Sequence, residues 1–288
     1  MNVKIITDSS CDLPNDYYKD YDIDMVPLTV HVNDQDYRDV KDIESKTVYD
    51  AMKKGAVPKT SQASPENFLQ VFSSYVEQSQ PVVYVGFSSE LSGTFQSAKI
   101  AQQQVLEEHP DAEVFVEDTK CASLGQGLVV LKAAQMAENG EAAEDIIKTV
   151  QFHASHMEHI FTVDNLEYLQ RGGRVSKAAA FFGGLLNIKP LLHVEEGQLV
   201  PLEKIRGAKK AKVLKRMFEV MEERGNEINR QTIAISHGDD LETAEKLASI
   251  IKEKYQPEKI LIGDIGSAIG AHAGPGTIAL FFLNDLYK

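Results

Sequence analysis

Cysteine is scarce in this chain of 288 residues, which contains only Cys11 and Cys121. Two cysteines cannot form a disulfide framework, so we expect a reducing compartment. Long apolar runs are also lacking, because the longest candidate, residues 178–192, contains Asn187, Lys189 and Pro190. A bilayer span needs about 20 apolar residues, so we expect no stable membrane insertion. With no signal-peptide core in its first strand-like run, the sequence predicts a cytoplasmic protein.

Positive charge is also scarce. The chain has 30 Lys and Arg but 43 Asp and Glu, which gives a formal net charge of −13. This balance argues against non-specific binding to nucleic acid. Nucleotide motifs are missing too: no G-x-G-x-x-G follows the first strand, and the P-loop glycines expected before Lys59-Thr60 are replaced by Lys53 and Pro58. Residues 86–90, Gly-Phe-Ser-Ser-Glu, lack the last glycine of a nucleophile elbow. Neither a nucleotide enzyme nor an α/β-hydrolase is favoured.

Strand-like and helix-like patterns alternate through the first half of the chain, which predicts an α/β fold with a mostly parallel sheet and flanking helices. The expected strands are 3–7, 25–32, 82–87 and 114–116, and the expected helices are 65–78, 94–108, 124–139 and 142–156. The second half adds a hairpin around Glu196-Gly197, so we expect a mixed sheet there. We place the boundary near residue 157, giving domains 1–157 and 158–288. Ligand sites favour such interdomain crevices.

Three junctions before predicted helices carry hydroxyl side chains. Thr60 and Ser61 precede the helix at 65, Ser92 and Gly93 precede the helix at 94, and Ser123 precedes the helix at 124. If these junctions follow strands of a parallel sheet, they gather at its ligand-binding edge. Helix N-termini and hydroxyls there favour an anion, although each hydroxyl alone is most often a simple helix cap.

A glycine-rich run, residues 266–277, follows the apolar run 260–265, which we interpret as a buried strand. We interpret the run as a loop that forms one wall of the anion site, with His272 and Thr277 as candidate residues. Glycine permits close approach of the backbone, and histidine can donate a hydrogen bond.

Two segments, 178–186 and 278–283, are apolar on all sides and are either ordinary core or the lining of an apolar ligand site. A chain of ~15 methylenes gains roughly 12 kcal/mol on burial, whereas a buried carboxylate without partners loses several. An amphiphilic acid therefore needs an apolar channel and a hydrogen-bonding head site, and the sequence offers candidates for both.

Five ordered segments, 7–14, 59–62, 91–94, 164–174 and 270–276, resemble the DegV family of bacterial fatty-acid-binding proteins with two α/β domains. The resemblance covers the whole chain. It implies a protein without catalysis or cofactor of its own, which binds a long-chain fatty acid and presents it to a separate fatty acid kinase. That kinase makes the acyl phosphate that enters phospholipid synthesis.

The same resemblance implies roles for residues that match the family motifs. Thr60 and Ser92 are expected to hold the carboxylate, with His272 nearby, while Ser61 and Gly93 supply further donors. The resemblance also implies that Arg171 and Arg174 lie near the pocket mouth. A basic run, 204–216, is either a solvated helix face or, as we interpret it, the docking surface for the kinase, with Arg206 nearest the mouth.

Other chemistry is weighed against this interpretation. The histidines at 153, 156 and 159 lack a completing carboxylate or cysteine, so we expect no metal site. Acids near Cys11 should raise its pKa, which disfavours a nucleophilic thiol. Two rival functions stay open: an acyl hydrolase or transferase that uses Ser92 or Cys11 with His272, and a binder of small phosphorylated metabolites.

Overall fold

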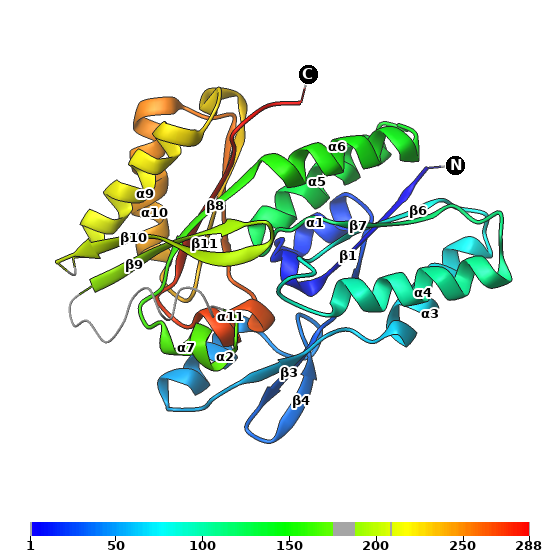
Figure 1. Ribbon diagram of the computed structural model, residues 1–288, viewed down its shortest axis with the longest axis horizontal. Coiled ribbons are helices and arrows are strands. Elements are labelled where there is room, and N and C mark those ends of the chain that lie inside the picture. Colours follow the sequence, from blue (N-terminus) through cyan, green and yellow to red (C-terminus); the bar gives the residue numbers. More distant parts are fainter. Residues whose placement is uncertain (1, 175–187, 208, 288) are drawn as a thin grey trace.

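The computed structural model describes residues 2–174, 188–207 and 209–287. The first half builds a parallel sheet in the order β2-β1-β6-β7. Its strands are β1 (Lys4–Asp8), β2 (Ile23–Val26), β6 (Val82–Gly86) and β7 (Val114–Asp118). The short helices η1 (Ser9–Cys11) and α1 (Asn15–Asp20) connect β1 to β2. Helices α3 (Pro65–Val76) and α4 (Thr94–Glu108) cover one face, as Figure 1 shows.

The second half builds a mixed sheet in the order β10-β9-β8-β13-β11-β12. Its strands are β8 (Met157–Thr162), β9 (Ile188–Glu195), β10 (Gln198–Arg206), β11 (Thr232–His237), β12 (Lys259–Asp264) and β13 (Ile278–Leu283). Among the described strands of this sheet, only β11 and β12 pair in parallel, and the other pairs are antiparallel. Its outer face is covered by α9 (Lys210–Arg224) and α10 (Leu241–Tyr255), with η2 (Ile228–Arg230) between α9 and β11.

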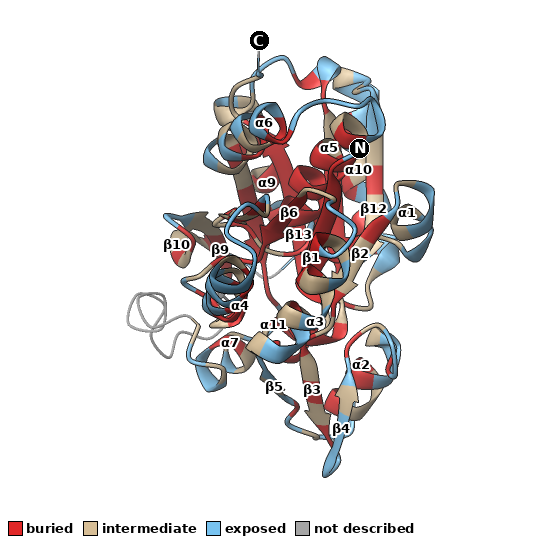
Figure 2. Cartoon of the chain, turned by 90° about the vertical axis from the view of Figure 1, so that its right-hand side faces the viewer, coloured by how far each residue is buried: buried red, intermediate tan, exposed pale blue. Residues whose placement is uncertain are grey.

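Helix α5 (Leu124–Glu138) lies between the two sheets and contacts strands of both. Its sequence is apolar around most of its circumference, and such a helix is stable only where it is buried on all sides. Together with α6 (Ala143–His156) it joins the inner faces of both sheets into one core, where buried residues concentrate in Figure 2. The strands of the first sheet all precede residue 157, and β8 of the second sheet begins there. Because α5 packs against both sheets, the domain boundary near residue 157 stays a prediction.

A small antiparallel sheet, β4-β3-β5, projects from one end of the molecule (Figure 2). It consists of β3 (Thr29–Val32), β4 (Gln35–Arg38) and β5 (Lys59–Ser61). Helices α2 (Ser45–Lys53) and α11 (Ser267–Ala273) pack against it, and the short α7 (Glu167–Arg171) packs against α11. This end of the molecule therefore brings residues from both halves of the chain together.

The predicted fold class is confirmed, and α4 has the bounds that the sequence predicts. Three local predictions are wrong. The strand predicted at 25–32 is two strands in different sheets, because Pro27 between them has no N–H to donate. The run predicted as a buried strand at 260–265 is an edge strand, β12, which spans Lys259–Asp264 and is only partly buried. The glycine-rich run is not all loop, since its three alanines and four neighbours form α11 between Gly266 and Gly274.

Candidate functional site

A cavity of about 330 Å³ lies where the small sheet, the start of α4, helix α11 and the inner face of the six-stranded sheet meet. One end is lined by hydroxyl, amide and imidazole side chains, and the rest is lined mainly by apolar ones. The polar end includes Thr60, Ser61, Gln62, Ser92, Arg174 and His272. The apolar part includes Leu28, Leu91, Phe161, Val194, Leu199, Ala279 and Phe281.

Thr60 reaches the cavity from β5, which belongs to the small antiparallel sheet and not to the parallel sheet. Its Oγ1 lies 2.7 Å from Nε2 of His272 on α11. Helix α11, which replaces the expected loop, therefore places His272 next to Thr60. The structure brings together two predicted site residues that are 212 positions apart in the chain.

Ser92 lies just before α4, and its Oγ is 2.8 Å from Oγ1 of Thr94 and accepts a hydrogen bond from the Thr94 N–H at 3.2 Å. Gly93 occupies the position that begins the helix. The unpaired N–H groups and partial positive charge of a helix N-terminus favour an anion at this point. Ser92 and Gly93 both line the cavity.

His272 is held in its neutral form. Burial, with a smaller contribution from the nearby Arg174 guanidinium, lowers the pKa of His272 to about 4. The ring packs so closely on Gly172 that a Cβ there would lie 2.2 Å from Nδ1. At neutral pH, His272 can therefore donate from Nε2 to Thr60, which leaves the Thr60 hydroxyl proton for a ligand.

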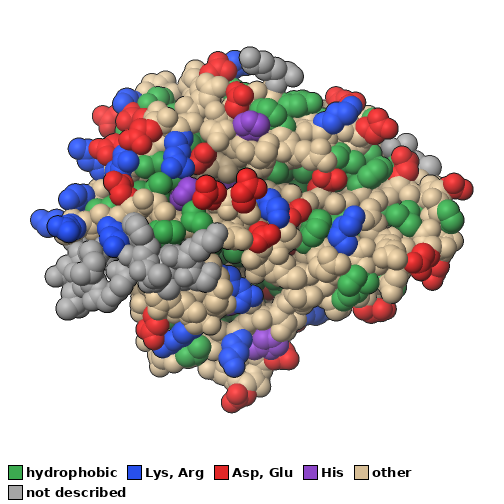
Figure 3. All heavy atoms as spheres, viewed as in Figure 1, with side chains coloured by type: hydrophobic (Ala, Val, Ile, Leu, Met, Phe, Trp, Pro, Cys, Tyr) green, Lys and Arg blue, Asp and Glu red, His purple; other side chains and the backbone are tan. Residues whose placement is uncertain are grey.

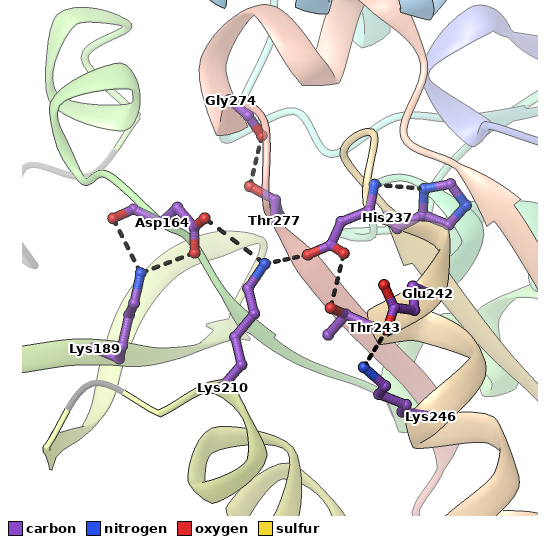
Figure 4. Close-up of polar contacts among 10 residues, drawn as sticks. Asp164, Lys189, Lys210, His237, Glu242, Thr243, Lys246, Gly274 and Thr277 are labelled. Carbon is purple, nitrogen blue, oxygen red and sulfur yellow. Dashed lines mark hydrogen bonds and ion pairs between the residues drawn. The ribbon is translucent and has the colours of Figure 1, made fainter.

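Two predicted site residues use their hydroxyl groups elsewhere. Ser61 is exposed, and its Oγ lies 2.7 Å from Nε2 of His31. Thr277 is buried and donates to the carbonyls of Ala273 and Gly274, both at 2.9 Å, and Figure 4 shows the bond to Gly274. Thr277 lines the cavity, but its hydroxyl closes the end of α11.

The apolar segment at 278–283 contributes both to the core and to the wall of the cavity. Ala279 and Phe281 line the cavity, whereas Ile278, Leu280 and Phe282 belong to the core on the opposite face of the sheet. This is the period of two expected for a strand. The other apolar segment, residues 178–186, lies outside the described residues.

The arginines expected at the mouth occupy different places. Arg174 lines the cavity, and its Nε donates to the Leu91 carbonyl at 3.2 Å. Arg171 is exposed, forms an ion pair with Glu167, and lines a second hollow of about 280 Å³. That hollow shares Thr60, His272 and Arg174 with the cavity, so these side chains form a wall between the two spaces.

Arg206 is exposed at the end of β10. Lys and Arg side chains gather on the side of the molecule that β10 and α9 form (Figure 3). Acids offset part of this charge: Lys210 pairs with Asp164 and Asp240, and Figure 4 shows Lys210 and Lys189 on either side of Asp164. Arg216 likewise pairs with Glu203 and two glutamates of α9.

Buried carboxyl groups hold the backbone next to the site in place. The sequence did not indicate this role. Asp8 accepts hydrogen bonds from the Phe87 N–H at 3.0 Å and from the Tyr84 hydroxyl at 2.6 Å. Asp39 accepts one from the Ala268 N–H in the first turn of α11. Burial raises the pKa of Asp12 and of Asp39. The position of His272 thus depends on buried acids from the first 40 residues.

The side chains considered for a hydrolase, Cys11 or Ser92 with His272, form other contacts. The Cys11 thiol is buried, its Sγ lies 3.2 Å from the Tyr18 hydroxyl, and burial is the main cause that raises its pKa to about 12. The hydroxyl group that Nε2 of His272 contacts is that of Thr60 and not that of Ser92. Across residues 2–174, 188–207 and 209–287, no group of three His, Cys, Asp or Glu side chains is arranged to hold a metal ion. In the same ranges, every helix is too short or too polar to cross a membrane.

Comparison with known proteins gives a consistent result. A family model described as an uncharacterised protein of the DegV family matches residues 2–285. A DegV domain-containing protein of Clostridium perfringens is 44% identical over 284 residues, which cover 98% of this chain and 97% of that protein. A second relative, from Caldanaerobacter subterraneus, is 35% identical over 97% of this chain and 98% of its own length.

Solved structures agree with the sequence relatives. A fatty-acid-binding DegV family protein from Thermus thermophilus superposes with a TM-score of 0.90 at 32% identity, covering 98% of this chain and 99% of that one. DegV of Bacillus subtilis, described as a fatty acid binding protein, gives a TM-score of 0.87 at 33% identity over 98% of both chains. A stearic-acid-binding protein from Eubacterium ventriosum gives 0.88 at 31% identity over 97% of both chains. The chain therefore belongs to the DegV family.

Proposed function

We propose that this protein binds one long-chain fatty acid, with its carboxylate at Thr60 and Ser92 and its acyl chain in the apolar part of the cavity. The observation that carries the proposal is the division of a single cavity into a hydroxyl-bearing end and an apolar remainder. Each buried methylene contributes ~0.8 kcal/mol, and the hydroxyls supply the hydrogen bonds that a desolvated carboxylate needs. The fatty-acid binding described for similar solved structures supports the same interpretation.

Although the head site has few polar groups, together they can bind an ionised carboxylate. Neutral His272 donates to Thr60, Thr60 and Ser92 donate to the carboxylate oxygens, and the Arg174 guanidinium supplies a positive charge beside them. The N-terminus of α4 adds its partial positive charge. These groups bind the ionised head without a fully buried ion pair.

The test is native mass spectrometry of the purified protein, followed by solvent extraction and identification of the released lipid. A long-chain acid bound at one per chain supports the proposal. A protein that retains no acid and takes up none from a supplied mixture would contradict it, and a bound phosphorylated metabolite would support the rival binding function.

We further propose that the bound acid is presented to a separate fatty acid kinase. The second hollow lies directly outside Thr60, His272 and Arg174, so a carboxylate on their inner side is one layer of side chains from solvent. Lys59 and Arg171 line this hollow and suit a phosphoryl group. Arg206, on the basic side of the molecule, is the proposed docking residue.

Reversal of the charge at Arg206 tests the docking role. We expect Arg206→Glu to lower acyl phosphate formation by a fatty acid kinase roughly tenfold at limiting protein, while fatty-acid binding stays unchanged. The same reversal at Lys252, an exposed residue of α10, is the matched control and should leave both unchanged. Equal loss of binding and phosphorylation in Arg206→Glu would refute a docking role.

A further inference from the structure

The end of the cavity away from His272 is closed by a row of side chains from four adjacent strands. Phe281 of β13 is in register with His159 of β8, and Leu199 of β10 with Val194 of β9. Extending the β8–β9 register by one residue places His159 beside Val194. All four side chains line the cavity. We call this set the end row.

The depth of the cavity follows from β13. Thr277 lies at the α11 end of the cavity, and Ala279 and Phe281 line it farther along the same face of the strand. At about 3.4 Å per residue, the four steps from Thr277 to Phe281 span roughly 14 Å. Beyond the end row, Met157 and Leu283 are paired in register and line a separate hollow of about 510 Å³. The end row therefore separates two spaces along one face of the sheet.

His159 is the polar member of the end row and is held rigidly. Its Nδ1 lies 3.1 Å from the Met157 carbonyl, and its Nε2 accepts the Ala122 N–H at 3.3 Å. Both ring nitrogens are thus satisfied in the neutral form, and burial lowers the pKa of His159 to about 4. The ring packs edge-on against Phe281, with the centroids 5.2 Å apart.

Helix α5 fixes this pair from the other side. A Cβ on Gly125 would lie 2.3 Å from Nε2 of His159 and 2.8 Å from Cδ1 of Phe281. Glycine at this position lets the two rings withdraw from the cavity toward the helix. A larger residue would push both rings toward the ligand space.

We propose that the end row, with His159 as its principal member, is the stop that sets the length of acyl chain this protein prefers. The inference rests on the proposed fatty-acid binding and names the substrate class of that same site. Removal of the imidazole should extend the cavity toward Met157 and Leu283. A side chain on Gly125 should shorten it.

The test measures the affinity of purified, delipidated protein for a homologous series of saturated acids from lauric to arachidic. We expect His159→Ala to move the optimum about two methylenes longer, with each newly accommodated methylene tightening binding about fourfold (~0.8 kcal/mol). Gly125→Ala should move the optimum in the opposite direction. Ile160→Val, next to His159 but in the core on the opposite face of β8, is the matched control and should keep the wild-type optimum.

Each outcome separates the inference from the function on which it rests. Wild-type protein that binds none of the acids contradicts the proposed function. Wild-type protein that binds them, with an unchanged optimum in folded His159→Ala, contradicts only the role of the end row. If His159→Ala does not fold, then Val194→Ala and Leu199→Ala, which remove no hydrogen bond, must lengthen the preferred chain for the inference to stand.

Discussion

The variant that combines Thr60→Ala with Ser92→Ala should fold normally and lose its fatty acid. Hydrogen bonds to a charged group contribute about 1.5–3 kcal/mol each, so loss of both should weaken binding by about 10²–10⁴-fold. In the variant, the carboxylate would lie in a space with few other hydrogen-bond donors. Native mass spectrometry and extraction should then find the acid only in wild-type protein, and a titration with delipidated protein gives the affinity ratio.

A hydroxyl in the same loop provides the control. Ser64 caps α3 by accepting the Asn67 N–H, and it does not line the cavity. Ser64→Ala should lower the free energy of unfolding by ~1 kcal/mol and leave ligand binding intact. If the folded double variant retains undiminished acid, the head site has been placed wrongly.

Alanine at Gly274 should cause the largest loss of stability among single substitutions near the site. Gly274 has a φ of +81°, and a Cβ there would lie 2.2 Å from Cδ2 of Tyr168. Backbone strain and a clash with the Tyr168 ring act together, so we expect the free energy of unfolding to fall by about 3 kcal/mol. Denaturant unfolding of the ligand-free protein measures the change.

Two other glycines separate these causes. Gly140 has a φ of +79° with nothing near its missing Cβ, so Gly140→Ala should show the strain alone, about 1 kcal/mol. Gly172 has an ordinary φ of −70° but would clash with His272, so Gly172→Ala should weaken ligand binding more than folding. If Gly140→Ala and Gly274→Ala lose equal stability, the contact with Tyr168 has no energetic role.

The sequence predicted the fold class because its strands and helices have clear periods. Because hydroxyls precede its predicted helices, it also pointed to several side chains that line the cavity, among them Thr60 and Ser92. It could not show that Thr60 reaches the site from a separate sheet, since a three-residue strand has too short a pattern to assign. It also missed α11, because the glycines at 266, 270 and 274 read as loop, although only those at 266 and 274 bound the helix.

The end row was missed for a different reason. Residues 157, 159 and 161 alternate with the residues of the opposite face, and so do 277, 279 and 281. That period predicts which side chains share a face, but pairing between strands decides that His159 meets Phe281. The three-residue spacing of His153, His156 and His159 drew attention to metal binding, whereas His159 alone enters the cavity.

The position of α5 between the two sheets has a consequence for how this protein melts. Neither half keeps a closed interior if the other loosens, because the helix would then expose an apolar side to water. The halves should therefore denature together in one cooperative calorimetric transition, although the chain is long enough to form two independent units.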